Sequence, residues 1–142
     1  MQNDNHSYVA LDVGHRRIGV AVAHAGALMP APLTTLAHTD DIMVRMQQLL
    51  TEQDAAALVV GLPRGLDGQE TAQTQSVRNF VRELQKHVSL PVHWQDEAVT
   101  SRQAEVELIA RGKPYRKEDI DALAATYILE DFLREHVKEV RV

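Results

Sequence analysis

The chain has 142 residues and no cysteine. That absence excludes disulfide bonds, thiolate zinc sites and cysteine nucleophiles together, and it fits a reducing compartment. The sequence also lacks any apolar run near the roughly 20 residues that a membrane-spanning helix needs, and its first residues are polar rather than signal-like. We therefore expect a cytoplasmic protein.

An excess of basic residues is missing as well. The chain has 15 Lys and Arg against 20 Asp and Glu, a net charge of −5. General nucleic-acid binders are usually basic, so a nucleic-acid substrate would have to be bound locally, with help from metal ions. The length and the ordinary balance of apolar and charged residues predict one globular domain, residues 8–142, after a disordered polar tail, residues 1–7.

Several apolar segments have the patterns of strands. Tyr8 to Gly14 and Ile18 to Ala23 each place bulky residues on one face and small residues on the other, and a hairpin-sized link joins them. A third strand around Pro32 to Ala37 completes a meander. The continuous apolar run from Ala57 to Leu62 predicts a strand buried on both faces, as in parallel sheets, and Pro91 opens a last strand that ends at Glu97.

Helical spacing of apolar residues predicts four helices, near Asp40 to Gln53, Thr71 to His87, Thr100 to Ala110 and Glu118 to His136. The order is three strands, helix, strand, helix, strand, helix, helix. It predicts an α/β fold with a mixed five-stranded sheet, an antiparallel three-strand meander plus two parallel strands, flanked by helices. Ligands of such sheets collect at the C-terminal ends of the parallel strands.

Three acidic residues stand where a metal site would need them. Asp12 and Glu97 lie at the ends of predicted strands, and Asp121 lies near the start of the last helix. Carboxylates that converge from different elements are typical of a site that holds Mg²⁺ or Mn²⁺ against phosphate. Asp is depleted in strands, and the neighbours of Asp12 on its face are small, which favours a ligand role over a merely exposed strand residue.

Two of these assignments have competitors. Asp96 and Glu97 fall on opposite faces of their strand, so at most one of them points at the site. Asp121 competes with the acidic residues just before it, since all of them suit the positive end of the helix dipole. Asp121 is favoured because Ala124 and Ala125 follow it at helical spacing and leave the helix edge bare where it should meet the first hairpin.

Basic residues flank the predicted site in the hairpin link, in the loop after the Ala57 strand, and before the last helix. Lys and Arg neutralise phosphates, so we expect these side chains to bind the substrate. They are Arg16, Arg17, Arg64, Lys113, Arg116 and Lys117.

Another basic row is open to two interpretations. Arg78, Arg82 and Lys86 recur at four-residue spacing on the second helix. A solvated face is the simpler interpretation, and a phosphate track is the alternative. Nearby, Trp94 is expected in the core and His93 is expected to be structural.

With these segments in place, the chain resembles the YqgF/RuvX family, the Holliday-junction-resolvase-like nucleases of the ribonuclease H-like fold. The resemblance runs from Val9 to Leu133 and rests on four motifs in order: Leu11 to Gly14 with Arg17 to Val22, Val59 to Pro63 with Asp67 and Gly68, Asp96 with Glu97, and Asp121 with Ala124 and Ala125. It implies a metal-dependent nuclease whose catalytic residues and Mg²⁺ or Mn²⁺ ligands are Asp12, Glu97 and Asp121.

The family's proposed roles are maturation of the 5′ end of the 16S ribosomal RNA precursor and resolution of branched DNA. The implied partner is therefore structured RNA or branched DNA, and the latter favours a homodimer because two strands must be cut symmetrically. The sequence departs from the family pattern at His15, usually a threonine, and at Ala98, usually an arginine. The second departure weakens the case for phosphate contacts after Glu97 and leaves the carboxylates intact.

Two other functions stay open at this point. A catalytically weak nucleic-acid-binding factor in ribosome assembly is compatible with Ala98 and with the acidic net charge. A phosphotransferase of the actin and sugar-kinase type shares the Asp12 to Gly14 hairpin, but such enzymes need a second comparable domain to close over ATP. Metal-dependent cleavage would exclude the first of these, and a lack of ATP binding would exclude the second.

Overall fold

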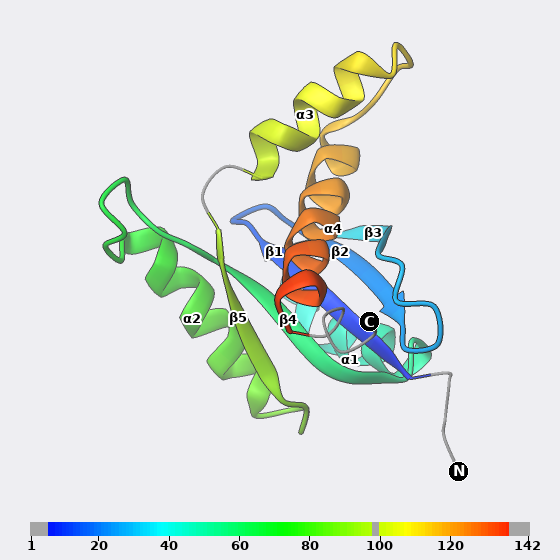
Figure 1. Ribbon diagram of the computed structural model, residues 1–142. Coiled ribbons are helices and arrows are strands. Elements are labelled where there is room, and N and C mark those ends of the chain that lie inside the picture. Colours follow the sequence, from blue (N-terminus) through cyan, green and yellow to red (C-terminus); the bar gives the residue numbers. More distant parts are fainter. Residues whose placement is uncertain (1–5, 98–99, 137–142) are drawn as a thin grey trace.

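In the computed structural model, residues 6–97 and 100–136 are described, and they form a five-stranded sheet with helices on both faces (Figure 1). Of the expected tail, residues 1–5 lie outside the described residues, and Ser7 already opens the first strand. The elements follow the predicted order: β1 (Ser7–Val13), β2 (Arg17–His24), β3 (Ala31–Ala37), α1 (Ile42–Glu52), β4 (Ala55–Pro63), α2 (Ala72–Gln85), β5 (Val92–Glu97), α3 (Thr100–Ala110) and α4 (Lys117–His136).

The sheet has the strand order β3-β2-β1-β4-β5. The pairs β1–β2 and β2–β3 are antiparallel, and the pairs β1–β4 and β4–β5 are parallel, so the predicted mixed topology is confirmed. The carboxyl ends of β1, β4 and β5 therefore meet at one edge of the sheet, where Pro63 pairs with Glu97. This is the edge at which ligands are expected in parallel sheets.

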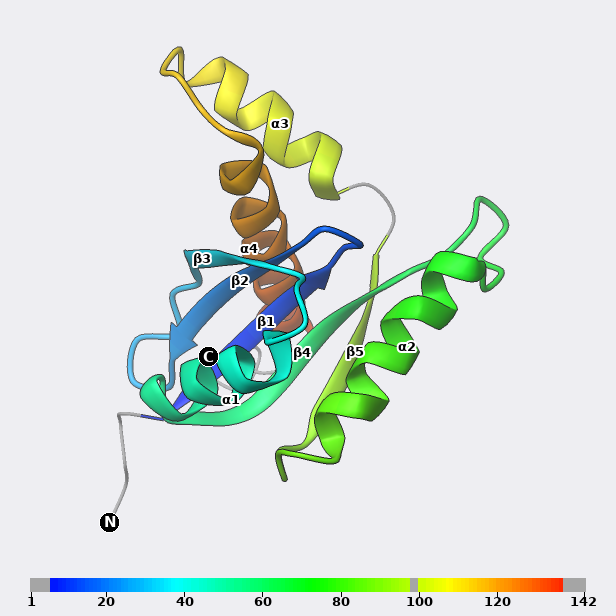
Figure 2. The ribbon, with the colours of Figure 1, turned by 180° about the vertical axis from the view of Figure 1, so that it is seen from behind.

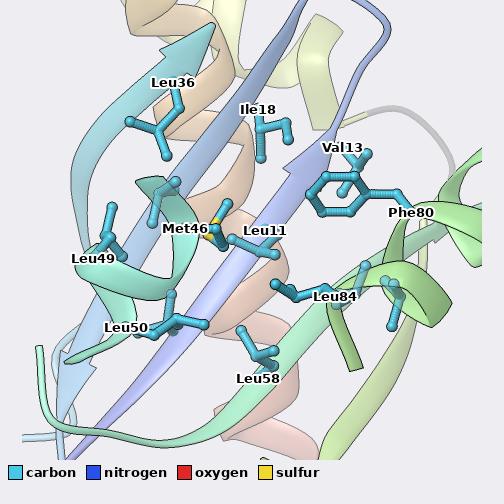
Figure 3. Close-up of a cluster of buried hydrophobic side chains, with 14 of the residues drawn as sticks. Leu11, Val13, Ile18, Leu36, Met46, Leu49, Leu50, Leu58, Phe80 and Leu84 are labelled. Carbon is cyan, nitrogen blue, oxygen red and sulfur yellow. The ribbon is translucent and has the colours of Figure 1, made fainter. Parts of the chain in front are cut away.

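One face of the sheet packs against α1 and α2. The bulky residues of the first hairpin, such as Leu11 and Ile18, are fully buried there beneath Met46 of α1 and Leu84 of α2 (Figure 3). Alternation along β1 and β2 places their large aliphatic side chains on this face, as the sequence predicts, whereas Tyr8 packs on the α4 side.

The opposite face is covered by α4, which lies behind the sheet in the reversed view (Figure 2). Ala10 and Ala21 are fully buried against this helix. Their small side chains let α4 approach the sheet closely, because a larger residue at either position would displace the helix.

Helix α3 packs on α4 rather than on the sheet and extends away from it (Figure 1). Ala124 contacts this helix, together with Ala104 and Leu108, whereas Ala125 packs against the sheet. The expectation that both alanines would face the first hairpin is therefore right only for Ala125. No helix in the described part of the chain is both long and apolar enough to span a membrane.

Candidate active site at the carboxyl edge of the sheet

Asp12 is the next-to-last residue of β1, and it pairs across the hairpin with Gly19 of β2. It follows Ala10 on the face that α4 covers and is half-buried. The strand thus delivers a carboxylate to the carboxyl edge of the sheet, beneath the start of α4.

Gly19 allows the first turns of α4 to touch the sheet next to Asp12. A Cβ atom at Gly19 would lie 1.9 Å from the carbonyl oxygen of Asp121 and 3.0 Å from the amide nitrogen of Ala122. Real Cβ atoms do not approach backbone this closely, so only glycine fits at this position. Because Gly19 has no side chain, Asp12 and Asp121, which are far apart in sequence, both lie next to it.

The side chain of Asp121 is fixed by Arg17. Arg17 Nε donates a hydrogen bond to Asp121 Oδ2 at 2.5 Å, and both side chains are largely shielded from solvent. This hydrogen bond, followed by the attraction between the two charges, raises the pKa of Arg17 above its ordinary value. A positive charge therefore sits directly on one of the three predicted metal ligands.

Asp119, another acidic residue at the start of α4, is engaged elsewhere. Asp119 Oδ2 accepts a hydrogen bond of 2.8 Å from the backbone amide of Arg116, the residue before the helix, and so caps its first turn. The backbone carbonyl of Glu118 accepts a bond of 2.7 Å from Thr35 Oγ1, which ties β3 to the helix. Asp121 rather than Asp119 is the carboxylate hydrogen-bonded to the hairpin.

The third predicted ligand stands at the end of β5. His93 and Gln95 alternate onto the α4 side of this strand: His93 stacks 5.0 Å from Phe132, and Gln95 Nε2 lies 3.3 Å from Glu135 Oε2. Position 97 belongs to the same face by alternation, whereas Asp96 belongs to the other. The side chain of Glu97 itself lies outside the described residues.

Asp96 is held by a basic residue of the neighbouring loop. Arg64 Nε donates to Asp96 Oδ1 at 3.0 Å, and Arg64 Nη1 donates to the carbonyl of Gly68 at 3.2 Å. The loop after β4 is anchored in turn where α2 begins, since Thr71 and Thr74 form a reciprocal cap and the hydroxyl of Thr74 also bonds the carbonyl of Pro63. Arg64 thus lies at the carboxyl edge of the sheet, on a loop that hydrogen bonds hold in place.

The remaining predicted phosphate-binding residues lie around this edge rather than in it. Arg16 is exposed in the turn between β1 and β2. Lys113 lines a groove of about 250 Å³ between α3, α4 and Pro32, and Arg116 lines a second groove of about 400 Å³ beside β3. Lys117 is exposed at the first position of α4. Arg17 alone of the six contacts a predicted metal ligand in the described contacts.

The donor chemistry suits a hard divalent cation. Asp12 pairs with Gly19, and the backbone of Asp121 lies against the same residue; both residues carry carboxylate oxygens, the donor type that Mg²⁺ and Mn²⁺ prefer. Among the side chains that the structure describes, which exclude that of Glu97, no three histidine or acidic residues gather into a metal-binding group. The oxygen donors present suit such a cation, and all three ligands, Asp12, Glu97 and Asp121, remain predictions.

Two features of the site were not predicted from the sequence. The Arg17–Asp121 pair joins residues 104 positions apart, and no local pattern announces it. The expectation that Trp94 is a core residue was wrong: 37% of the residue is exposed, and its ring lies 5.2 Å from the guanidinium carbon of Arg78. Alternation could have found this, since Trp94 shares its strand face with the polar Asp96.

Comparison with known proteins identifies the family of this chain. The family model described as RuvX, Holliday junction resolvase, matches residues 6–135. The chain belongs to this family. Three relatives carry the name "Putative pre-16S rRNA nuclease". The RuvX-family chain is 35% identical to the protein of Legionella pneumophila (strain Paris), over 90% of this chain and 95% of the relative. It is 39% identical to the protein of Nitratidesulfovibrio vulgaris (strain DP4), over 89% of this chain and 92% of the relative. It is 42% identical to the protein of Chloroflexus aurantiacus (strain J-10-fl), over 88% of this chain and 84% of the relative.

Solved structures share the fold of this RuvX-family protein. Thermus thermophilus RuvC in complex with a Holliday junction substrate superposes with a TM-score of 0.58 at 18% identity, covering 93% of this chain and 97% of RuvC. The fowlpox virus resolvase in complex with Holliday junction DNA gives 0.54 at 12% identity, covering 92% and 99%. The predicted ribonuclease H-like, mixed α/β fold is confirmed.

Proposed function

We propose that this protein is a metal-dependent nuclease that hydrolyses phosphodiester bonds in structured nucleic acid. The observation that carries the proposal is the placement of Asp12 and Asp121 on either side of Gly19, at the carboxyl edge of the sheet. Membership of the RuvX family and the names of the relatives support the same activity.

Asp12, Asp121 and Glu97 would hold Mg²⁺ or Mn²⁺, and the bound cation would supply Lewis-acid charge and a more acidic water. The chain's own contribution is geometric. β1 fixes Asp12, the close approach at Gly19 fixes the backbone of Asp121, and Arg17 fixes its carboxylate. Arg17 and Arg64 add positive charge at the edge where a phosphate would lie, which favours the charge that develops during phosphodiester attack.

The substrate we propose is the 5′ region of pre-16S rRNA, in agreement with the names of the relatives and with an expected cytoplasmic location. Branched DNA is the second candidate, because the family description and both solved neighbours concern Holliday junctions. Symmetric cutting of a four-way junction would require a homodimer, whereas trimming of one RNA strand would not.

A cleavage panel tests the proposal. Precursor RNA with its 5′ extension, single-stranded DNA and a four-way junction would each be incubated with Mg²⁺, Mn²⁺ or EDTA. We expect cleavage that requires the cation and is lost in Asp12→Asn, with the stability of the fold kept or raised because one repelling carboxylate is removed. Asp131→Asn, at the far end of α4, is the matched control and should cleave normally.

Normal turnover by Asp12→Asn would overturn the mechanism. Tight binding of RNA without cleavage under any cation would instead identify a binding factor of ribosome assembly. Sedimentation of the protein with the four-way junction would show whether two copies assemble on it.

A further inference from the structure

Trp94 is the only tryptophan of the chain and lies on β5, an edge strand of the sheet. It faces α2, on the opposite side of the strand from His93 and Gln95, and 37% of the residue is exposed. A large aromatic ring is costly to leave in water, so partial exposure beside a proposed active site is a feature that needs an explanation.

The ring has a fixed cationic neighbour. The guanidinium carbon of Arg78 lies 5.2 Å from the centroid of Trp94, within the range of a cation–π contact. Arg78 is held there by Glu70, which accepts bonds of 3.0 Å and 2.6 Å from its Nε and Nη2. The same contact lowers the pKa of Glu70, so the pair stays charged over a wide pH range. Arg78 and Trp94 thus form a preorganised pair with part of the indole still open.

The pair lies close to the proposed site. Trp94 precedes position 97 by three residues, a distance of about 10 Å along a strand. Position 97 lies on the α4 face of β5 and Trp94 on the α2 face, so a single strand of a few nucleotides would link the metal edge to the indole. A strand leaving that edge reaches Trp94 by passing the outer side of β5, which no other strand of the described sheet covers.

Positive charge continues beyond the ring along α2. Arg82 and Lys86 follow Arg78 at four-residue spacing, and both are exposed. Arg82 Nη1 bonds the neutral side chain of Asn79, so this contact leaves its charge uncompensated, whereas Lys86 pairs with Glu83. An aromatic platform flanked by positive charge is how proteins bind single-stranded nucleic acid.

We propose that Trp94 and Arg78 form a subsite that stacks an unpaired base of a single-stranded segment next to the bond that is cleaved. The proposal rests on the nuclease function above and adds the class of substrate that it prefers. A base in a duplex already stacks on its neighbours and cannot open toward the indole without a cost in unstacking. The subsite therefore selects substrates with an unpaired flank over continuous duplex.

The single tryptophan makes the subsite directly observable. The intrinsic fluorescence of the protein would be titrated with an oligouridine, an abasic oligonucleotide of the same length and a duplex RNA, in EDTA so that no cleavage occurs. We expect quenching by the oligouridine and little by the other two, because only unpaired bases can stack on the indole. Equal quenching by the abasic strand would overturn the proposal.

Variants give a second measurement, the anisotropy of a labelled oligouridine. Trp94→Ala should weaken binding by roughly 5- to 100-fold, the usual effect of removing one stacking residue. Trp94→Phe should retain most of the affinity, and Val106→Ala, which trims another exposed apolar residue on α3, should not change it. Thermal unfolding would confirm that each variant folds.

The two proposals fail in distinguishable ways. Unchanged affinity in Trp94→Ala with intact wild-type cleavage would overturn the subsite and leave the nuclease standing. Base-dependent quenching without cleavage under any cation would do the reverse. Loss of binding to a protein partner, with no change toward oligouridine, would show that Trp94 anchors a protein and that the stacking subsite is wrong.

Discussion

Arg17 and Asp121 form a hydrogen-bonded ion pair of 2.5 Å between the second strand and the last helix. The pair places a protein cation on a carboxylate that is proposed to bind a metal cation. Arg17 fixes the position of this carboxylate and also shares its negative charge with the metal, and the net effect of Arg17 on metal affinity can be measured without any substrate.

Replacing Arg17 with Gln removes the competing charge. We expect the affinity for Mn²⁺, measured by calorimetry, to rise several-fold, because the carboxylate no longer shares its charge with a guanidinium at hydrogen-bond distance. Arg16→Gln is the matched control, since Arg16 is exposed in the adjacent turn. Weaker Mn²⁺ binding in Arg17→Gln would contradict this expectation and show that the positioning of Asp121 by Arg17 outweighs the competition for its charge.

Substitution of the two acidic residues Asp119 and Asp121 at the start of α4 should have different effects on cleavage. Asp121→Asn is expected to abolish metal-dependent cleavage, because Asp121 lies against Gly19 next to Asp12. Asp119→Asn should keep most of the activity and lose at most about 1 kcal/mol of stability, since Asp119 caps the helix. Cleavage assays with both variants decide the point, and the reverse pattern would mean that the wrong carboxylate has been assigned.

Larger side chains at the contact between β2 and α4 should destabilise the fold. Gly19→Ala would place a methyl group 1.9 Å from the carbonyl of Asp121 and should cost at least about 1–3 kcal/mol in the free energy of unfolding. Ala21→Leu should be similarly costly, because Ala21 is fully buried beneath the same helix. Urea unfolding measures both, with Ala37→Ser on the exposed end of β3 as control. Midpoints like that of the wild type would contradict this packing.

The contact between α3 and α4 should lose stability in alkaline solution. Burial, followed by the hydrogen bond to Glu107, raises the pKa of Tyr127 from 10.0 to about 12. A raised pKa means that the folded state favours the protonated phenol, so this stabilisation is complete below pH 10 and is lost as the pH rises through about 12. Tyr127→Phe should lose less stability than the wild type between pH 10 and 12 in thermal melts; equal losses would disprove the assignment.

The basic segment before α4 should act on binding rather than on chemistry. Changing Lys113, Arg116 and Lys117 to Ala should weaken RNA affinity and flatten its salt dependence by roughly one unit of slope for each lost phosphate contact. Turnover at saturating substrate should change little, since all three side chains are exposed and lie beyond the carboxylates. An unchanged salt slope would reduce the segment to a solvated connector.

Local patterns were enough to predict most of the fold. Alternation in the first hairpin separated Leu11 from Ala10, and the structure puts them in different cores. The three carboxylates were also predicted from sequence, through their strand ends and the family resemblance, and their roles as metal ligands remain predictions. What the sequence could not show depends on tertiary contact: the partner of Arg17 is 104 residues away.

The errors have similar causes. Trp94 was assigned to the core because tryptophan is usually buried, but an edge strand leaves one side of its residues to solvent. Ala124 was assigned to the sheet because it stands one turn after Asp121, yet a helix between two neighbours divides its small residues between them. Composition and spacing identify apolar positions without saying which neighbour covers them.

Because α4 completes the proposed site, the site can form only late in the synthesis of the chain. Asp12 and Gly19 leave the ribosome early, but Asp121 follows them by about a hundred residues, a delay of about 5 to 20 s at ordinary rates of synthesis. Until that helix has emerged and docked, the first hairpin carries a carboxylate without its partner. Under the proposed mechanism, a nascent chain would not cleave nucleic acid until α4 docks on β2.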